Sequence, residues 1–317
     1  MKALVISGSG WLGHNVVKKL VKRGHNVTVI AIDQKEKFKL PPPAKFIWGD
    51  RTKTPEFKKI LAGVDAESVV DVTPDTESTK NIIESFKGRI KHYVHCSSTG
   101  VYTPLQRIPA NEEHPWEEPT GLNFMFKVEP DRLALEYYRR DGFPATIIRP
   151  TNIMGPGSLP IDIWGARNPR FLWRVLKEET ITVPNDGRAL LQPVYVEDLA
   201  EAFALVLENK QSIGQTYNIA GDYSVTLNEY LRLICEILKR KPPVTHLPIG
   251  EMINQFAGKS GLDVEGLKFF CEHMCFDISK AKKELGYRVN VSLEESVKRT
   301  IDWCLANNLI SSTQPTN

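Results

Sequence analysis

The stretch Ala3-Leu4-Val5-Ile6-Ser7-Gly8-Ser9-Gly10-Trp11-Leu12-Gly13 decides the fold. Its first four residues are apolar, which indicates a strand buried on both faces. Three glycines follow with the spacing G-x-G-x-x-G, and residues 15–22 behind them carry apolar side chains on one face, which predicts a helix. A strand, a glycine turn and a helix in this order favour a dinucleotide-binding unit.

Each glycine of this turn has its own expected task. Gly8 permits the tight turn, Gly10 lets the backbone approach a pyrophosphate, and Gly13 lets the helix lie close to the strand. Trp11 and Leu12 begin the helix, whose N-terminal N–H groups favour an anion. We therefore expect these five residues to bind a dinucleotide, with a glycine-rich turn that binds no ligand as the alternative.

An acidic residue follows the second expected strand. Asp33 stands 33 − 13 = 20 residues after Gly13, where a carboxylate accepts hydrogen bonds from an adenosine ribose and repels a 2′-phosphate. This position favours NAD over NADP, although Lys35 and Lys37 follow closely. The alternative is a solvated turn aspartate.

A second polar pair, Asp50 and Arg51, follows the third expected strand at the edge of the sheet where cofactors bind. Asp50 could accept a hydrogen bond from an adenine amino group. A simple turn after the strand is the alternative. We include both residues among the expected cofactor-binding positions.

Short apolar runs alternate with amphipathic segments through the first half of the chain. The runs that predict strands are residues 3–6, 27–32, 44–48, 69–72, 92–96 and 146–148, with 217–220 later in the chain. This alternation predicts an α/β fold with a doubly wound parallel Rossmann sheet and right-handed crossovers. Beyond about residue 155 glycine and proline interrupt the pattern, and the tail is mostly helical.

The expected domain organisation follows from this change of pattern. Residues 1–155 form the dinucleotide-binding domain, to which 190–222 return. Residues 156–189 and 223–317 form a smaller, mostly helical C-terminal substrate lobe. A substrate would then lie in the cleft between the two parts.

Composition excludes several classes of protein. The 317 residues carry 41 Lys+Arg and 38 Asp+Glu, a net charge of +3, with 41% hydrophobic residues, which excludes wholesale disorder and a rod. No apolar run approaches the roughly 20 residues that cross a bilayer, so we expect no membrane contact. Met1 leads straight into the first expected strand without a signal peptide, so we expect a cytoplasmic protein. The charge is too small to indicate nucleic-acid binding by itself.

The five cysteines indicate neither a disulfide framework nor a metal centre. Cys271 and Cys275 flank His273, but their spacing is not that of a paired zinc knuckle, and phenylalanines surround them. We expect a buried apolar segment there and no metal site.

Several motifs together resemble a known family, the extended short-chain dehydrogenase/reductases and, among them, the NAD-dependent epimerases and dehydratases. Their order along the chain carries the resemblance. The motifs are Gly8-x-Gly10-x-x-Gly13, Gly49-Asp50, Ser97–Tyr102, Arg149–Asn152, Pro193–Asp198 and Phe276–Tyr287. The resemblance implies NAD as cofactor and adds Pro150 to the cofactor-binding residues.

The resemblance also implies catalytic positions, and one of them departs from the family. Thr99 is placed to polarise a substrate oxygen, and Lys127 to bind the nicotinamide ribose. The family's catalytic tyrosine stands four residues before this lysine, where the present chain has Asn123. An asparagine amide neither gives nor takes a proton near neutral pH. Tyr102 is the nearest alternative phenol, with packing beside the cofactor as its other interpretation.

A second departure concerns the substrate. Nucleotide-sugar members carry an arginine where this chain has Leu191, and Arg188 nearby is as readily an exposed turn residue. The resemblance therefore implies an epimerase/dehydratase-like oxidoreductase that acts on a carbonyl or a polyol-like or sugar-like substrate. Similar proteins form homodimers through the helices that correspond to residues 76–86 and 130–140.

The alternative is a non-catalytic binding protein that kept the NAD fold and binds RNA or senses redox state. The missing tyrosine and the turn at Val183–Gly187 resemble the atypical subgroup that includes the chloroplast stem-loop-binding proteins. Three basic clusters could contact RNA or be solvated helix faces. They are Lys18-Lys19, Lys22-Arg23 and Lys239-Arg240-Lys241.

Overall fold

The computed structural model describes residues 1–33, 38–258 and 262–310, so Lys35 and Lys37 lie outside the described residues. Its centre is a seven-stranded sheet with the order β11-β6-β5-β4-β1-β2-β3, in which all neighbours are parallel. The strands are β1 (Lys2–Ile6), β2 (Asn26–Ala31), β3 (Lys45–Trp48), β4 (Ser68–Asp71), β5 (His92–Cys96), β6 (Ala145–Pro150) and β11 (Thr216–Ile219). The predicted doubly wound parallel sheet is confirmed.

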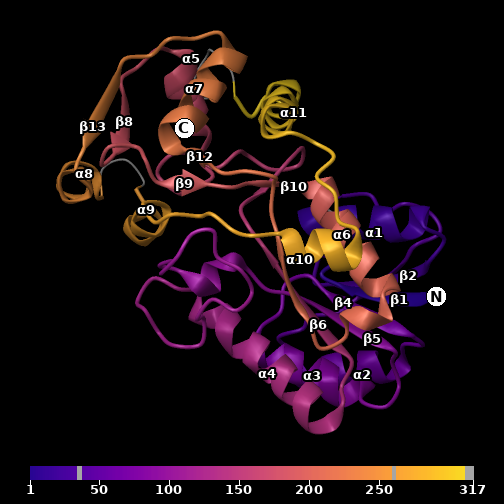
Figure 1. The fold of residues 1–317 in the computed structure, drawn as a ribbon. Helices are drawn as coiled ribbons and strands as arrows, with labels where there is room; N and C mark the ends of the chain where they lie inside the picture. Colours follow the sequence, from indigo (N-terminus) through magenta and orange to yellow (C-terminus); the bar gives the residue numbers. More distant parts are fainter. Residues whose placement is uncertain (34–37, 259–261, 311–317) are drawn as a thin grey trace.

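Helices cover both faces of this sheet (Figure 1). One face is covered by α1 (Trp11–Lys22) and α6 (Val196–Glu208), whose buried valines, leucines and phenylalanine join one apolar core with the sheet. The other face carries α2 (Thr54–Gly63), α3 (Thr76–Phe86) and α4 (Met125–Asp141), which close a second core. The helix α10 (Ser279–Leu285) returns to the first face late in the chain.

A smaller lobe lies beyond the carboxyl ends of the strands (Figure 1). Its helices are α5 (Pro169–Leu176), α7 (Leu227–Leu238), α8 (Ile249–Phe256), α9 (Val264–Phe270) and α11 (Leu293–Ala306). Its strand pairs are β13 (Val244–Leu247) with β8 (Ile181–Pro184), β12 (Val225–Thr226) with β9 (Leu190–Leu191), and β10 (Val194–Tyr195) with β7 (Ile153–Met154). The domain boundaries at residues 155, 190 and 222 stay a prediction, and the lobe's core also takes in Val101 and Tyr102 from the sheet half.

The strand order fixes where a ligand can lie. From β1 the chain winds outward through β2 and β3, and then returns to the other side of β1 for β4. The loops that follow β1 and β4 therefore leave in opposite directions and open a crevice at the carboxyl end of the sheet. The glycine turn after β1 lines this crevice.

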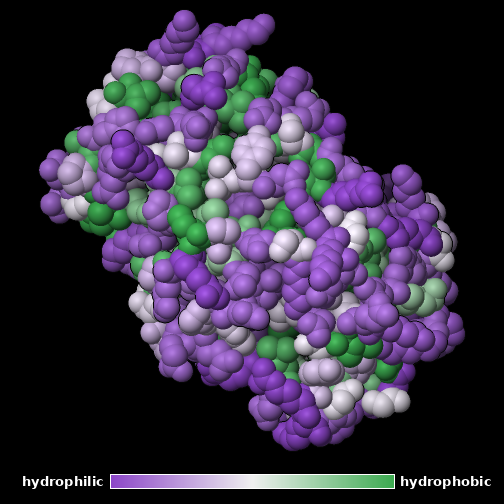
Figure 2. Space-filling model, in the orientation of Figure 1, coloured by the Kyte–Doolittle hydropathy of each residue, from purple (hydrophilic) through white to green (hydrophobic). Residues whose placement is uncertain are grey.

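None of the described helices combines the length and apolarity needed to cross a bilayer. Figure 2 shows a face that is mostly hydrophilic, with hydrophobic residues in small separate patches. Large hydrophobic side chains that are exposed, such as Trp48 and Phe126, stand on different elements.

A buried charge cluster joins α4 to the middle of the sheet. Asp131, which is fully buried, lies 3.0 Å from the Arg149 guanidinium on β6 and 3.1 Å from His95 Nε2 on β5, and it accepts a hydrogen bond of 2.6 Å from Ser97. Burial raises the free-energy cost of each charged group, so the cluster is stable only while the Asp131 carboxylate and the Arg149 guanidinium are both present.

Replacing the acid of this cluster tests that statement. Asp131→Ala leaves the Arg149 charge buried without its partner, and we expect it to lower the free energy of unfolding by about 3–5 kcal/mol. Glu136→Ala on the same helix removes only an exposed pair with Arg140 and should cost less than about 0.5 kcal/mol. Urea denaturation of both variants measures the difference, and equal losses would contradict the assignment.

Candidate functional site

The glycine turn after β1 forms a cradle at the N-terminus of α1. Gly13 lies so close to β1 that a Cβ on it would stand 2.3 Å from the Ser7 carbonyl oxygen, and a Cβ on Gly8 would stand 2.9 Å from Val29. These two glycines are therefore required by packing within the protein. The first turn of α1 carries no acidic residue, so its N–H groups keep their favourable field for an anion.

Gly10 differs from its two neighbours. A Cβ there would meet only the Ser7 carbonyl oxygen, at an ordinary 3.6 Å, and its φ of −74° suits any residue. The fold itself therefore leaves room for a side chain at the half-exposed opening of the cradle. Packing within the protein therefore does not require a glycine at this position, and the open backbone suits the close approach of a pyrophosphate.

Trp11 connects the cradle to the lobe. Its indole Nε1 donates a hydrogen bond of 2.7 Å to the Pro156 carbonyl, and Gly157 lies directly against its ring. The Arg167 guanidinium stands 5.4 Å from the ring centroid. Leu12 is buried in the core under α1, so only its backbone faces the cradle.

The acidic residues predicted to bind the adenosine lie at the ends of β2 and β3. Asp33 is exposed just past β2. Asp50 is also at the surface, where it accepts hydrogen bonds from the backbone and hydroxyl of Thr52, which lower the pKa of its carboxyl. Asp50 thus stabilises the turn after β3, which agrees with the alternative interpretation of this residue as a turn aspartate. Its contact with an adenine stays a prediction.

Arg51 is held inside the protein. Its guanidinium makes two hydrogen bonds of 2.8 and 2.9 Å to the carboxylate of Asp71, which is fully buried at the end of β4, and it also contacts Asp75 and Ser78. These contacts fix the loop after β4 against the start of α3. Arg51 therefore shapes the crevice from behind, and its direct contact with a cofactor stays a prediction.

Thr99 and Lys127 both contact segments that follow strands of the sheet, and their roles toward substrate and ribose stay predictions. The Lys127 ammonium donates a hydrogen bond of 3.3 Å to the Pro74 carbonyl, at the loop after β4. Thr99 begins a short 3₁₀ helix (Thr99–Tyr102) after β5, and its hydroxyl donates to the Pro150 carbonyl at 3.3 Å. Pro150 ends β6, so its carbonyl helps to orient the Thr99 hydroxyl.

Asn123 is occupied by the loop before α4. Its amide Nδ2 donates to the Glu118 carbonyl at 2.9 Å, and its Oδ1 accepts from the Thr120 backbone at 3.0 Å. Because α4 begins only at Met125, Asn123 and Lys127 do not share a helical face as residues four apart in a helix would. The asparagine thus fastens the loop before α4, at the position where the resemblance implies a proton-transfer tyrosine.

Tyr102 does not take over that role in this structure. Its ring is 1% exposed, and its hydroxyl lies between the Asn218 side chain at 3.0 Å and the Arg149 guanidinium at 2.8 Å. Burial raises the pKa of this phenol. The geometry supports the alternative interpretation, in which Tyr102 is a packing residue.

An inner cavity of about 450 Å³ lies between the sheet edge and α9. Thr99 and Ser98 line it, whereas Tyr102, Asn123 and Lys127 do not. The other lining side chains are hydroxyls, an amide, four phenylalanines and two carboxylates, together with small and aliphatic residues. They include Thr103, Phe124, Thr151, Asn152, Asp263, Glu265, Phe269, Phe270, Met274 and Phe276.

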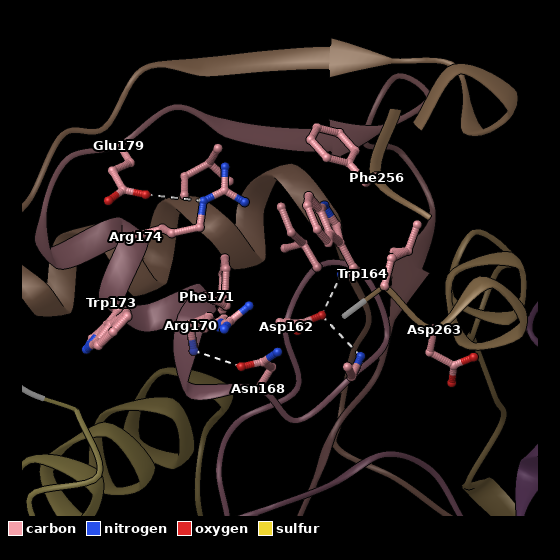
Figure 3. Close-up of a pocket in the computed structure, with 14 residues that line it drawn as sticks. Asp162, Trp164, Asn168, Arg170, Phe171, Trp173, Arg174, Glu179, Phe256 and Asp263 are labelled. Carbon is pink, nitrogen blue, oxygen red and sulfur yellow. Dashed lines mark hydrogen bonds and ion pairs between the residues drawn. The ribbon is translucent and has the colours of Figure 1, made fainter. Parts of the chain in front are cut away.

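An outer cavity of about 470 Å³ lies wholly within the lobe, between α5 and the end of α8 (Figure 3). Trp164 and Phe256 form its aromatic side, with ring centroids 5.1 Å apart. Asp162 lies under this ring pair and accepts backbone hydrogen bonds from Trp164 and Ala166. Burial raises the pKa of Asp162 to about 6. No sequence motif points to this residue.

The residues considered for diphosphate binding are not suited to it. Leu191 is fully buried, and the Arg188 side chain is 81% exposed, 3.6 Å from Asp186. Arg188 is therefore the exposed turn residue of the two alternatives. Neither residue lines the inner or the outer cavity.

The basic clusters that could have contacted RNA are separated and partly neutralised. On α1, Lys19 lies 3.0 Å from Glu201, and Arg23 contacts both Glu201 and Glu208 of the neighbouring helix α6. The cluster at residues 239–241 lies at the end of α7 in the lobe, away from α1 (Figure 1). The clusters thus do not form one basic face.

Within residues 1–33, 38–258 and 262–310, no group of three or more potential ligands is placed to hold a metal ion.

The chain matches a known family over most of its length. The sequence pattern of the NAD-dependent epimerase/dehydratase family covers residues 3–220. The trifunctional UDP-glucose 4,6-dehydratase/UDP-4-keto-6-deoxy-D-glucose 3,5-epimerase/UDP-4-keto-L-rhamnose-reductase RHM1 of Arabidopsis thaliana is 24% identical over 96% of this chain, which spans only 47% of that relative's length. The chloroplast stem-loop binding protein of 41 kDa b of Arabidopsis thaliana is 27% identical over 93% of this chain and 77% of its own.

Solved structures share the fold. The UDP-glucose 4-epimerase of Thermotoga maritima, solved with UDP-glucose, gives a TM-score of 0.76 at 23% identity and covers 98% of this chain and 100% of its own. The dTDP-glucose 4,6-dehydratase of Bacillus anthracis, solved in complex with NAD, gives 0.77 at 20% identity and covers 98% of both chains.

The raised pKa of Asp162 predicts a pH dependence of stability. Because the folded-state pKa of about 6 lies above the ordinary value of 3.8, the native state binds the extra proton between these pH values, and stability falls as pH rises through that window. Asp162→Asn keeps an acceptor for the two backbone N–H groups. We expect it to match the parent protein at pH 4 and to exceed its unfolding free energy at pH 7 by at most about 3 kcal/mol.

Chemical denaturation at both pH values measures this difference. Asp186→Asn, whose side chain is 67% exposed, is the control and should show no pH-dependent gain. An Asp162→Asn effect that is the same at pH 4 and pH 7 would contradict the assignment.

Proposed function

Because the chain belongs to the NAD-dependent epimerase/dehydratase family, we propose that it binds NAD in the crevice after β1 and β4 and oxidises or reduces a carbonyl or a polyol-like or sugar-like substrate in the inner cavity. The observation that carries the proposal is the glycine turn at the α1 N-terminus, where Gly8 and Gly13 are required by packing and Gly10 leaves the backbone open to a ligand. When bound, NAD supplies a hydride acceptor or donor at its nicotinamide.

The residues of this chain would bind the cofactor and orient the substrate. The cradle of Gly8, Gly10 and the α1 N-terminus binds the pyrophosphate. Lys127, whose ammonium donates a hydrogen bond to the Pro74 carbonyl in the loop after β4, would bind the nicotinamide ribose. Thr99 lines the inner cavity and would hydrogen-bond the reacting oxygen of the substrate.

The proton must move without the family's tyrosine. Asn123 cannot exchange a proton, and the Tyr102 phenol is buried with a raised pKa. Among the described residues that line the inner cavity there is no tyrosine, lysine or histidine. Water in the cavity, or one of its carboxylates, Asp263 or Glu265, would therefore carry the proton.

Gly10→Val tests the nucleotide half of the proposal. A Cβ at Gly10 makes only an ordinary contact and the φ of −74° is normal, so we expect the variant to fold with an unchanged unfolding midpoint while the new side chain fills the pyrophosphate position. We expect the affinity for NAD to fall by about 100-fold or more in calorimetric titration. Gly63→Val, at the open end of α2, is the control that keeps affinity. Undiminished NAD binding by Gly10→Val would contradict the assignment of the cradle as the pyrophosphate site.

Thr99→Val tests the catalytic half. NADH consumption with a panel of aldehydes, ketones and keto-sugars first identifies a turned-over substrate. With that substrate we expect kcat to fall by about 100-fold in Thr99→Val, with NADH affinity unchanged, and to recover in Thr99→Ser. If the protein binds NADH but turns over nothing in the panel, a binding protein that uses NAD as a ligand replaces the enzymatic proposal.

A further inference from the structure

Ser7, the first residue after β1, has a left-handed backbone although it is not a glycine. Its φ is 61°, and the conformation is fixed because its N–H donates to the Ile30 carbonyl at 2.7 Å and its carbonyl accepts from the Gly10 N–H at 3.3 Å. A side chain is strained in this region, whereas a glycine adopts it freely. A strained serine at the start of the cradle therefore points to a function of its hydroxyl.

The Ser7 hydroxyl is the last member of a hydrogen-bond chain that begins at Arg51. Arg51 Nη1, which is paired with Asp71, donates to Thr73 Oγ1 at 3.2 Å, and Thr73 Oγ1 donates to Ser7 Oγ at 2.6 Å. The Thr73 backbone N–H also donates to Asp71, at 3.3 Å, which fixes the threonine. Because a hydroxyl has one proton and Ser7 accepts the proton of Thr73, the proton of Ser7 is directed away from Thr73.

Ser7 and Thr73 stand on the two loops that open the crevice. Ser7 follows β1 and Thr73 follows β4, so the hydrogen bond between them joins these loops where the strand order reverses. Ser7 is half-buried and Thr73 is exposed. Neighbouring hydrogen bonds in such a chain polarise one another, so a hydroxyl reached from a guanidinium is a good donor to an anionic oxygen.

We propose that the Ser7 hydroxyl donates a hydrogen bond to a pyrophosphate oxygen of NAD, and that Thr73 and Arg51 are positioning residues that act through Ser7. The cradle then offers the anion a side-chain donor beside the N–H groups of α1. Arg51 contributes to cofactor binding without touching the cofactor, which agrees with its place behind the crevice. This assignment rests on the proposed function, because it requires NAD in the crevice.

Ser7→Ala and Ser7→Gly test the contact in the full chain. Ser7→Ala keeps the Cβ and removes only the hydroxyl, and we expect the affinity for NAD to fall by about 5- to 20-fold in calorimetric titration. Its thermal unfolding midpoint should change by less than about 3 °C, because the lost hydrogen bond to Thr73 is exposed. Ser7→Gly relieves the backbone strain, so it should unfold no earlier than Ser7→Ala and bind NAD as weakly.

Thr73→Val tests whether the threonine acts through Ser7. It interrupts the chain and should weaken NAD binding by about 2- to 5-fold, whereas Thr73→Ser keeps a hydroxyl and should bind as the parent does. The double variant with Ser7→Ala should bind NAD as weakly as Ser7→Ala alone, since Thr73 has nothing left to position. Additive losses would show an independent contact of Thr73 and reject its positioning role.

Two comparisons make the test specific. Lys239→Gly, which replaces another left-handed residue (φ 54°) at the end of α7 in the lobe, is the control and should leave the affinity for NAD unchanged. ADP carries a diphosphate and adenosine does not, so Ser7→Ala should weaken ADP binding and leave adenosine binding unchanged in ligand-detected NMR titration.

The outcomes that overturn this proposal differ from those that overturn the proposed function. Undiminished NAD affinity in Ser7→Ala, in a parent protein whose Gly10→Val variant loses NAD, would reject the Ser7 contact and keep the cradle. Equal weakening of ADP and adenosine by Ser7→Ala would reject the pyrophosphate as the acceptor. A parent protein without affinity for NAD would reject the proposed function and this proposal together.

Discussion

The close approach of α1 to β1 is the constraint on which the site depends. At Gly13 the helix and the preceding turn are so near that a single methyl group would stand 2.3 Å from the Ser7 carbonyl oxygen. This contact sets the direction of α1 and aims its N-terminal N–H groups at the crevice between β1 and β4. Gly8 is fixed by the same packing, and only Gly10 is left without a reason inside the protein. The distinction separates the two glycines that packing requires from the one at which the backbone stays open.

Local patterns predicted this part of the molecule well. The strand–turn–helix order and the alternation of apolar runs depend on neighbours in sequence, and the sheet has the predicted parallel, doubly wound form. Thr99 and Lys127 were assigned by family resemblance, and in the structure they contact Pro150 at the end of β6 and Pro74 in the loop after β4, while their roles stay predictions. The spacing of residues in the sequence could not reveal which hydrogen-bond or ion-pair partners a polar side chain has in the folded protein. Arg51 is held by Asp71, Asp50 closes a turn, and neither arrangement is visible in the sequence.

Other parts of the site could not be predicted because residues distant in the chain assemble them. The inner cavity joins the loop after β5, the end of β6 and the segment around α9, which follows the other two by more than 100 residues. Thr151 stands in a recognised motif, yet the motif does not show that tertiary packing leaves its buried hydroxyl without a hydrogen-bond partner. Asp162 gives no sequence signal, because its raised pKa arises from burial by the lobe. In each case the surroundings decide the chemistry more than the residue type.

Asn123 holds the loop that leads into α4. A tyrosine on the first turn of α4 would share a helical face with Lys127, which could lower the pKa of its phenol. In this chain the helix begins two residues later than Asn123, and the amide fastens residues 118–120 over the sheet edge. Phe124, the next residue, is thereby held flat against Gly100 and supplies an apolar wall to the cavity. The loop that Asn123 holds thus leads directly into an aromatic wall of the cavity.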